Sequence, residues 1–148
     1  MKKFHFRLAT LMRVREATRD ECRAQLAEAL RVQAALDDQA QELERTMREA
    51  RESHRTPRGE VNVDRLMDAE RYEIILLVER KKLEAQQESV SKEVEKRRQA
   101  LVWADQDVRV LERLRENETV RWRQSAEREA MQQLDELAGR NRPQEVFP

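Results

Sequence analysis

The feature that most constrains this chain is a run from about Asn62 to about Ala138 that contains neither proline nor glycine. Apolar residues recur along it at steps of seven, or of three and four, which is the a/d rhythm of a coiled coil. These seam positions are Ala69, Leu76, Leu83, Val90, Val94, Leu101, Ala104, Val108 and Leu111. The run predicts a helix on the order of 110 Å long, which cannot bury its stripe alone and therefore requires a partner.

The first part of the chain supplies a candidate partner, a helix predicted from about Phe6 to about Ser53. Its seam is Leu8, Leu11, Arg15, Thr18, Cys22, Gln25, Ala29, Val32, Leu36, Leu43 and Ala50. Between the two helices, residues 54–61 contain Pro57 and Gly59, which break helices and favour turns. We therefore expect an αα-hairpin turn, with Asn62 or Asp64 as the cap of the second helix.

The two seams face each other when the numbers of facing residues add to 119, as they do for Leu36 with Leu83. The centre of this register falls inside the predicted turn, so two independent signals agree. The sequence thus predicts an all-α fold, one antiparallel two-helix coiled-coil hairpin over residues 1–138, with helices at about 6–53 and 62–138. Residues 139–148 are expected to form a flexible tail. Because residue 4 faces residue 115, the second helix should continue as an overhang of roughly 35 Å.

Charge and cysteine content narrow the function classes. Charged residues make up 41% of the 148 residues, and 30 Lys and Arg balance 30 Asp and Glu. Because the two signs are interleaved, the charges indicate a solvated helix surface rather than a basic face for nucleic acid. The single cysteine, Cys22, favours a reducing compartment. No run approaches the roughly 18 apolar residues of a membrane span, so we expect a cytoplasmic protein.

The residue pattern gives no support for a catalytic function. His5 and His54 are the only histidines, and no Cys/His cluster has metal-binding spacing. No glycine-rich loop is present to cradle a phosphate. Carboxylates are abundant, but on an open helix surface nothing would exclude water from them. We therefore predict no catalytic, cofactor-binding or metal-ligating residue, and we interpret Cys22 as a small core residue.

The expected overhang keeps an apolar stripe with no remaining segment to cover it. The stripe consists of Trp122, Ala126, Ala130, Leu134 and Leu137. An exposed apolar stripe usually marks a protein-binding surface. The alternatives are self-association and a fold-back against the N-terminus.

A second apolar stretch runs from Tyr72 to Val78 and reads YEIILLV. Leu76 belongs to the seam, but Ile74, Ile75, Leu77 and Val78 spread around more than one face. Either the stretch is a second docking site or it widens the core locally together with Met47.

Two short motifs resemble the FliJ family of flagellar export stalk proteins. The first is the N-terminus from Phe4 to Arg15, similar to the family's F-x-F-x-L-x-x-L-L-x-x-R start, with Met12 in place of the second paired leucine. The second comprises Val110–Arg115 and the later Leu134-Asp135-Glu136, similar to V-L-E-K-L-K and L-D-E. Trp122 stands where family members often carry tyrosine.

The resemblance implies a non-enzymatic central stalk of the flagellar type III export apparatus, at the cytoplasmic face of its membrane-embedded part. Such a stalk binds the export ATPase ring, the export gate protein FlhA and export chaperones, and needs no cofactor. The residues expected to meet the ATPase ring are Arg121, Trp122, Ala126, Arg128, Leu134, Asp135 and Glu136. Those expected to meet the gate are Tyr72, Ile74, Ile75 and Val78. The alternatives are the equivalent stalk of a virulence type III secretion system and a generic coiled-coil scaffold or chaperone.

Overall fold

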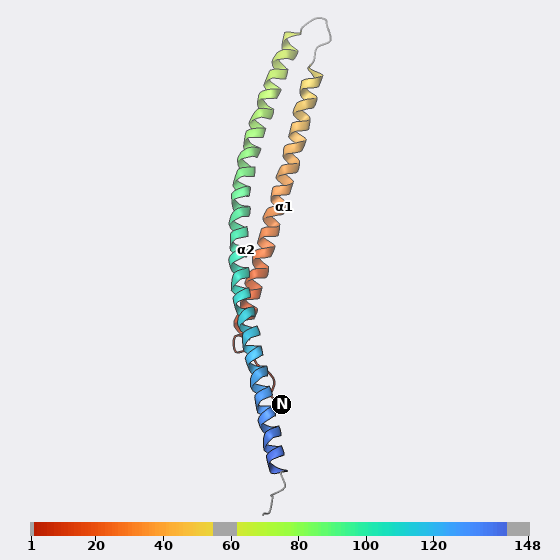
Figure 1. The fold of residues 1–148 in the computed structure, drawn as a ribbon. Helices are drawn as coiled ribbons and strands as arrows, with labels where there is room; N and C mark the ends of the chain where they lie inside the picture. The colour runs from red at the N-terminus through yellow and green to blue at the C-terminus, as the bar shows by residue number, and fades with distance from the viewer. Residues whose placement is uncertain (1, 55–61, 142–148) are drawn as a thin grey trace, which may run out of the picture. The chain divides into compact units, whose positions relative to one another are not determined.

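The computed structural model describes residues 2–54 and 62–141 and contains two helices (Figure 1). They are α1 (Ala9–Ser53) and α2 (Val63–Arg140), and no strand occurs among the described residues. The predicted all-α fold of two long packed helices is therefore confirmed. Helix α1 begins at Ala9 rather than at Phe6, whereas its end at Ser53 is where the sequence placed it. The predicted turn at Pro57 and Gly59 lies outside the described residues.

Local side-chain and backbone bonds explain where α2 begins and ends. The backbone N–H of Asp64 donates to Oδ1 of Asn62 at 3.1 Å, so Asn62 rather than Asp64 is the cap. At the other end, the helix passes through Gly139 to Arg140, and the N–H of Asn141 donates to the carbonyl of Leu137 at 3.1 Å. The sequence placed the end of this helix at about residue 138, but a glycine only weakens a helix that neighbouring residues favour.

The chain forms two compact units, each built from parts of both helices. The middle unit spans Asp20–Trp103. The terminal unit combines the chain up to Arg19 with the chain from Ala104 onward.

The seam predicted for α2 holds at every position. Each of its nine residues is buried or half-buried, from Ala69 in the middle unit to Leu111 in the terminal unit. Val108, with no exposed surface, is the most buried of them. An uninterrupted heptad of small and branched apolar residues leaves only one face suitable for burial, which is why the sequence identified it.

The seam predicted for α1 is only partly correct. Cys22, Ala29, Leu36, Leu43 and Ala50 are buried or half-buried, as expected. Five other predicted positions are exposed, and the next residue along the chain is covered in their place. The exposed positions are Leu11, Arg15, Thr18, Gln25 and Val32, and the covered neighbours are Met12, Glu16, Arg19, Leu26 and Gln33. The face of α1 is thus rotated by one residue at these positions.

The predicted register was wrong by about one helical turn. Three contacts cross the middle unit: Gln87 Nε2 to Asp37 Oδ1 at 3.0 Å, Arg97 Nη1 to the Gln25 carbonyl at 2.7 Å, and Arg80 Nε to Glu44 Oε1 at 3.3 Å. Their residue numbers add to 124, 122 and 124 rather than to 119. A seam residue of a coiled coil packs into a hole formed by several residues of the facing helix, so the apolar pattern alone does not fix the register.

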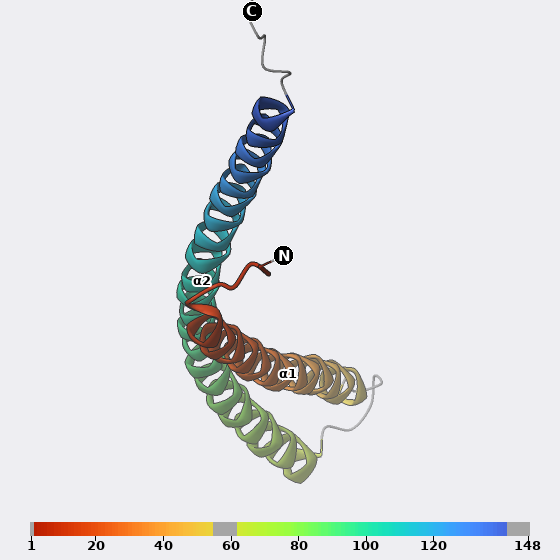
Figure 2. The same cartoon turned by 90° about the horizontal axis from the view of Figure 1, so that it is seen from below.

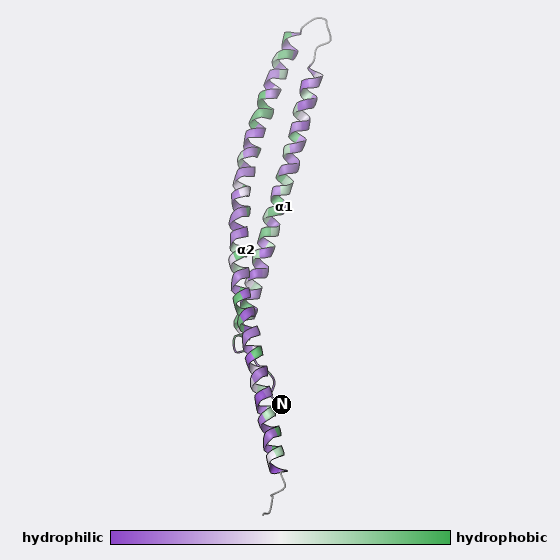
Figure 3. Cartoon of the chain, viewed as in Figure 1, coloured by the Kyte–Doolittle hydropathy of each residue, from purple (hydrophilic) through white to green (hydrophobic). Residues whose placement is uncertain are grey.

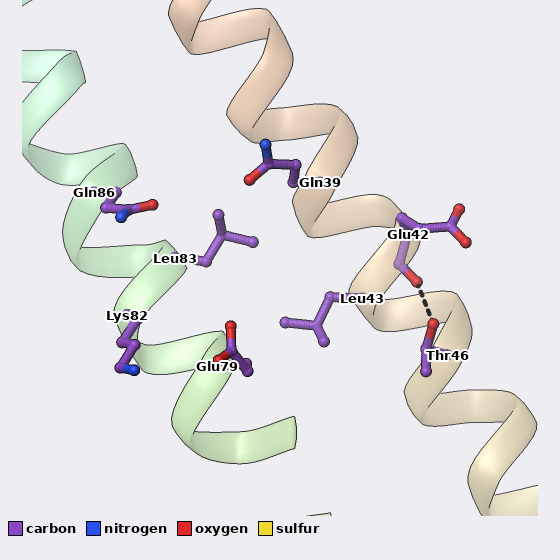
Figure 4. Close-up of a pocket in the computed structure, with 8 residues that line it drawn as sticks. All are labelled: Gln39, Glu42, Leu43, Thr46, Glu79, Lys82, Leu83 and Gln86. Atoms are coloured by element: carbon purple, nitrogen blue, oxygen red, sulfur yellow. Dashed lines mark hydrogen bonds between the residues drawn. The ribbon is translucent and has the colours of Figure 1, made fainter. Parts of the chain in front are cut away.

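Leu83 shows the consequence of the corrected register. It lines a pocket of about 370 Å³ together with Gln39 and Leu43, rather than facing Leu36 (Figure 4). In this view Leu83 of α2 and Leu43 of α1 point toward each other across the gap between the helices (Figure 4).

The two helices of the middle unit diverge toward Ser53 and Val63, as both views of the ribbon show (Figures 1 and 2). A second pocket, of about 330 Å³, lies between them there. It is lined on the α1 side by Met47 and Ala50 and on the α2 side mainly by Leu66, Tyr72 and Leu76. Met47 is nevertheless 3% exposed, so the seam remains covered at this end, as it is at Ala29 and Val94 with 5% and 4%.

Candidate functional site

A short non-helical segment precedes α1 and lies against α2 in the terminal unit. We call residues 2–8 the strap. Phe6 of the strap is 5% exposed and packs with Met12 of α1 and Leu111 of α2. Phe4, Leu8, Ala9 and Leu114 pack against this cluster. The N–H of Ala9 donates to the Phe6 carbonyl at 3.2 Å, which turns the chain into the helix.

The strap reaches further along α2 than a helix would. Its Phe4 ring lies 6.1 Å from the Trp122 ring, centroid to centroid, at an interplanar angle of 57°. Arg7 Nε lies 3.7 Å from Glu118 Oε1. An extended chain advances about 3.3 Å per residue against about 1.5 Å for a helix, so a few strap residues span two turns of α2. The prediction that coverage ends near residue 115 was therefore wrong.

Trp122 is consequently not bare. It is 38% exposed, the least of the described large apolar residues that follow Thr119. The ring angle is close to the tilted arrangements that aromatic pairs favour. Of the three interpretations of the overhang, a fold-back against the N-terminus holds for this one residue.

Beyond Trp122, α2 continues without cover. Every described residue from Arg123 to Asn141 is exposed, and we call residues 123–140 the bare segment. Met131, Leu134 and Leu137 are 62%, 61% and 56% exposed. A helix with no packed face gains nothing from tertiary contacts, so this segment is the least stabilised part of α2.

The predicted ring-contact residues are on or beside the bare segment, but they do not share one face. Trp122, Ala126 and Leu134 lie on the apolar side of the helix. Arg121, Arg128 and Asp135 recur at steps of seven and lie together on the opposite side, because seven residues make almost two turns. Among the described residues, no ion pair joins these three charges to another side chain.

The predicted gate-contact residues lie in α2 of the middle unit and are exposed to different degrees. Ile74, Ile75 and Val78 are 60%, 58% and 47% exposed, and Tyr72 is 44% exposed. Tyr72 also lines the pocket beside Met47, which is 3% exposed. The alternative of a wider core therefore applies to Tyr72 alone, because the other three residues do not line that pocket.

The exposed apolar surface of the middle unit is larger than the sequence analysis predicted. Val63, Leu66 and Met67 are 65%, 50% and 48% exposed and lie in α2 just before Tyr72. In the hydropathy view, green segments are visible in the first turns of α2 and again further along the helix (Figure 3). These residues precede Ala69, the first seam position, and Val-x-x-Leu-Met at the helix start is itself an apolar cluster.

Few of the described residues are candidates for metal binding or for thiol chemistry. No group of three or more His, Cys, Asp and Glu among them lies close enough to hold a metal ion. Cys22 is half-buried on the α1 seam. No described helix is long and apolar enough to cross a membrane.

Comparison with known proteins assigns nearly the whole chain to one family. The model of the family described as flagellar FliJ protein matches residues 4–144. The match takes in the strap from Phe4 onward, both helices and the bare segment. No curated protein and no solved structure matches the chain.

Proposed function

Because the chain belongs to the FliJ family of flagellar export-associated proteins, we propose that it is the non-enzymatic stalk that couples the export ATPase to the export gate. On this proposal it works at the cytoplasmic face of the membrane-embedded export apparatus and also contacts export chaperones. The bare segment of α2 enters the ATPase ring, and the apolar surface of the middle unit meets the gate protein FlhA.

The observation that carries the proposal is the bare segment itself. Residues 123–140 form a helix with Met131, Leu134 and Leu137 exposed, although α2 elsewhere buries its apolar seam. Natural sequences rarely keep such a surface unless something binds it. The charges of Arg128 and Asp135 on the opposite side favour a partner that encloses the helix, which a ring does and a flat surface does not.

The coupling mechanism follows from unequal binding. A helix seated in a ring stabilises the conformations of the ring that fit it, and it stabilises each only by its difference in affinity. Nucleotide hydrolysis belongs to the ATPase. The chain supplies a surface with different chemistry on its two sides, with Leu134 on one and Arg128 on the other, so that each subunit of the ring meets a different face.

The middle unit provides the second contact. Ile74, Ile75 and Val78 stand clear of the seam, and the nearby pocket beside Met47 and Tyr72 adds an apolar recess. Bulky aliphatic side chains together with an aromatic ring are typical of the buried centre of a protein interface. The gate therefore has an anchor region in α2 that is distinct from the bare segment.

A reciprocal pair of double variants tests the proposal. Leu134→Ser with Leu137→Ser should weaken ATPase binding on the order of 30-fold, the effect of losing interface anchors worth about 2 kcal/mol, and leave gate binding unchanged. Ile75→Ser with Val78→Ser is the matched control, since it also removes two exposed aliphatic residues of α2. It should weaken gate binding and leave ATPase binding unchanged.

Titrations of both purified partners and a thermal melt of each variant give the result. If both double variants still bound both partners, the proposal that the bare segment binds the ATPase and the middle unit binds the gate would be refuted. Equal losses at both partners with a lowered melting temperature would show instead that the residues support the fold. Self-association of the wild-type chain that disappears with Leu134→Ser and Leu137→Ser would favour a scaffold that assembles through this segment.

A further inference from the structure

The strap ends at the boundary of the bare segment, and Trp122 is the residue that the two regions share. Phe4 packs on Trp122 at 6.1 Å, and Arg7 lies 3.7 Å from Glu118. Because successive helix residues turn by about 100°, Glu118 lies about 40° to one side of Trp122 and Ala126 about 40° to the other. The strap thus covers one flank of the indole, while the apolar stripe of the bare segment continues from the other flank.

We propose that the tip of the strap is a displaceable cover of the ATPase-binding surface. In the free chain the Phe4 ring lies against the Trp122 ring, and docking of the bare segment in the ring of the ATPase exchanges Phe4 for a side chain of the partner. This inference rests on the proposed function, since it concerns the same binding surface.

The strap is held unequally along its length, and this difference defines what moves. Phe6 is 5% exposed and belongs to the cluster with Met12 and Leu111, so it anchors the strap. Phe4 is only half-buried, and residues 2–5 donate no described backbone hydrogen bond outside a helix. The ion pair of Arg7 involves a side chain that is 76% exposed, where such pairs contribute little. The tip can therefore detach at Phe6 while the cluster remains.

Detachment of Phe4 also makes Trp122 available to the ATPase. Trp122 is the only tryptophan beside the bare segment, and tryptophan is the residue most enriched among interface anchors. A binding surface that is open for only a fraction of the time binds with an affinity reduced by that fraction. The strap consequently sets a threshold for docking, and a change that detaches Phe4 without altering Trp122 should strengthen binding.

Phe4→Ala tests this threshold directly. In a titration with the purified export ATPase, Phe4→Ala should bind about three- to tenfold more tightly than the wild-type chain, the size of effect that one aromatic pair produces. Trp122→Ala should bind more weakly. Lys3→Ala is the matched control, because Lys3 is an exposed strap residue beside Phe4, and it should bind as the wild type does.

A spectroscopic measurement separates a cover from a structural support. In a Trp103→Phe background, which leaves Trp122 as the only indole, acrylamide should quench Phe4→Ala more strongly than its parent in the free state. With the ATPase bound, the two chains should be quenched equally, because the partner has replaced Phe4.

The remaining outcomes distinguish failure of the proposed cover from failure of the proposed function. If the wild type and Lys3→Ala bind and Phe4→Ala binds equally or more weakly, the cover is refuted and the proposed function stands. If quenching of the free chain is unchanged by Phe4→Ala, the cover is refuted as well. If none of the chains binds the ATPase, the proposed function fails and the inference fails with it.

Discussion

The seam part of α2 and its bare segment belong to one helix, yet only the seam part is packed against a second segment. From Leu76 to Leu111 the apolar residues are buried at regular steps against α1. From Arg123 onward no described residue is covered, although Met131, Leu134 and Leu137 continue an apolar side. The difference shows that an apolar stripe in this chain contributes to folding stability only where a second segment meets it.

The contrast between the packed and the bare parts of α2 predicts that the largest loss of stability occurs at Val108, which has no exposed surface. Val108→Asp should lower the free energy of unfolding by about 4 kcal/mol or more, because it places an unpaired carboxylate between the helices. Val110→Asp is the control, since Val110 lies two residues away and is 66% exposed. It should change stability by less than about 0.5 kcal/mol. Urea unfolding of both variants provides the measurement, and similar losses at both positions would contradict the assigned seam.

The second prediction concerns the rotated face of α1. Met12 is 8% exposed in the cluster with Phe6 and Leu111, whereas the neighbouring Leu11 is 41% exposed. Met12→Ala should therefore cost about 2–3 kcal/mol in the free energy of unfolding, within the range for buried aliphatic side chains. Leu11→Ala should cost less than about 1 kcal/mol. A larger loss from Leu11→Ala would restore the seam that the sequence predicted.

We expect an intermediate loss of stability at Trp122, where the strap ends. Trp122→Ala should cost about 1 kcal/mol through the loss of its contact with Phe4. Leu134→Ala, in the bare segment, should leave the melting temperature of the free chain unchanged because Leu134 contacts no second segment. If the two substitutions lowered the melting temperature equally, the bare segment would have to be packed in solution.

The smallest effect tests the register. Arg80 and Glu44 form an interhelical ion pair at 3.3 Å, with side chains 45% and 48% exposed. A double-mutant cycle of Arg80→Ala and Glu44→Ala should give a coupling energy of about 0.5 kcal/mol that falls at high salt. The same cycle with Glu44 and Lys82 serves as control and should give no coupling. Coupling only in the control cycle would mean that the helices pair differently.

The sequence was sufficient to predict the part of the fold that follows a regular heptad pattern. Helix α2 could be predicted because Leu76, Leu83 and their heptad equivalents are apolar and nothing interrupts them. Helix α1 was harder, since its covered positions include Arg19 and Gln33 while the adjacent Val32 is exposed. There the geometry of α2, and not the hydropathy of each residue, decides which face is buried.

The strap could not be derived from the heptad rhythm, because it is not helical. Phe6 was predicted to begin a helix, whereas Phe4 and Phe6 stand two residues apart and so share one side of an extended segment. That alternation is the one signal in the sequence that predicts such a contact. The position of the contact on α2 depends on how far an extended chain reaches, and this requires the structure.

Hydrogen exchange of the chain with and without the export ATPase tests the central claim most directly. In the free chain, backbone amides of residues 123–140 should exchange rapidly, since opening an unpacked helix requires little free energy, while those around Val94 and Val108 should exchange slowly. Addition of the ATPase ring should slow exchange in residues 123–140 by at least about tenfold and leave the seam region unchanged. Continued rapid exchange of residues 123–140 in the bound state would contradict the account.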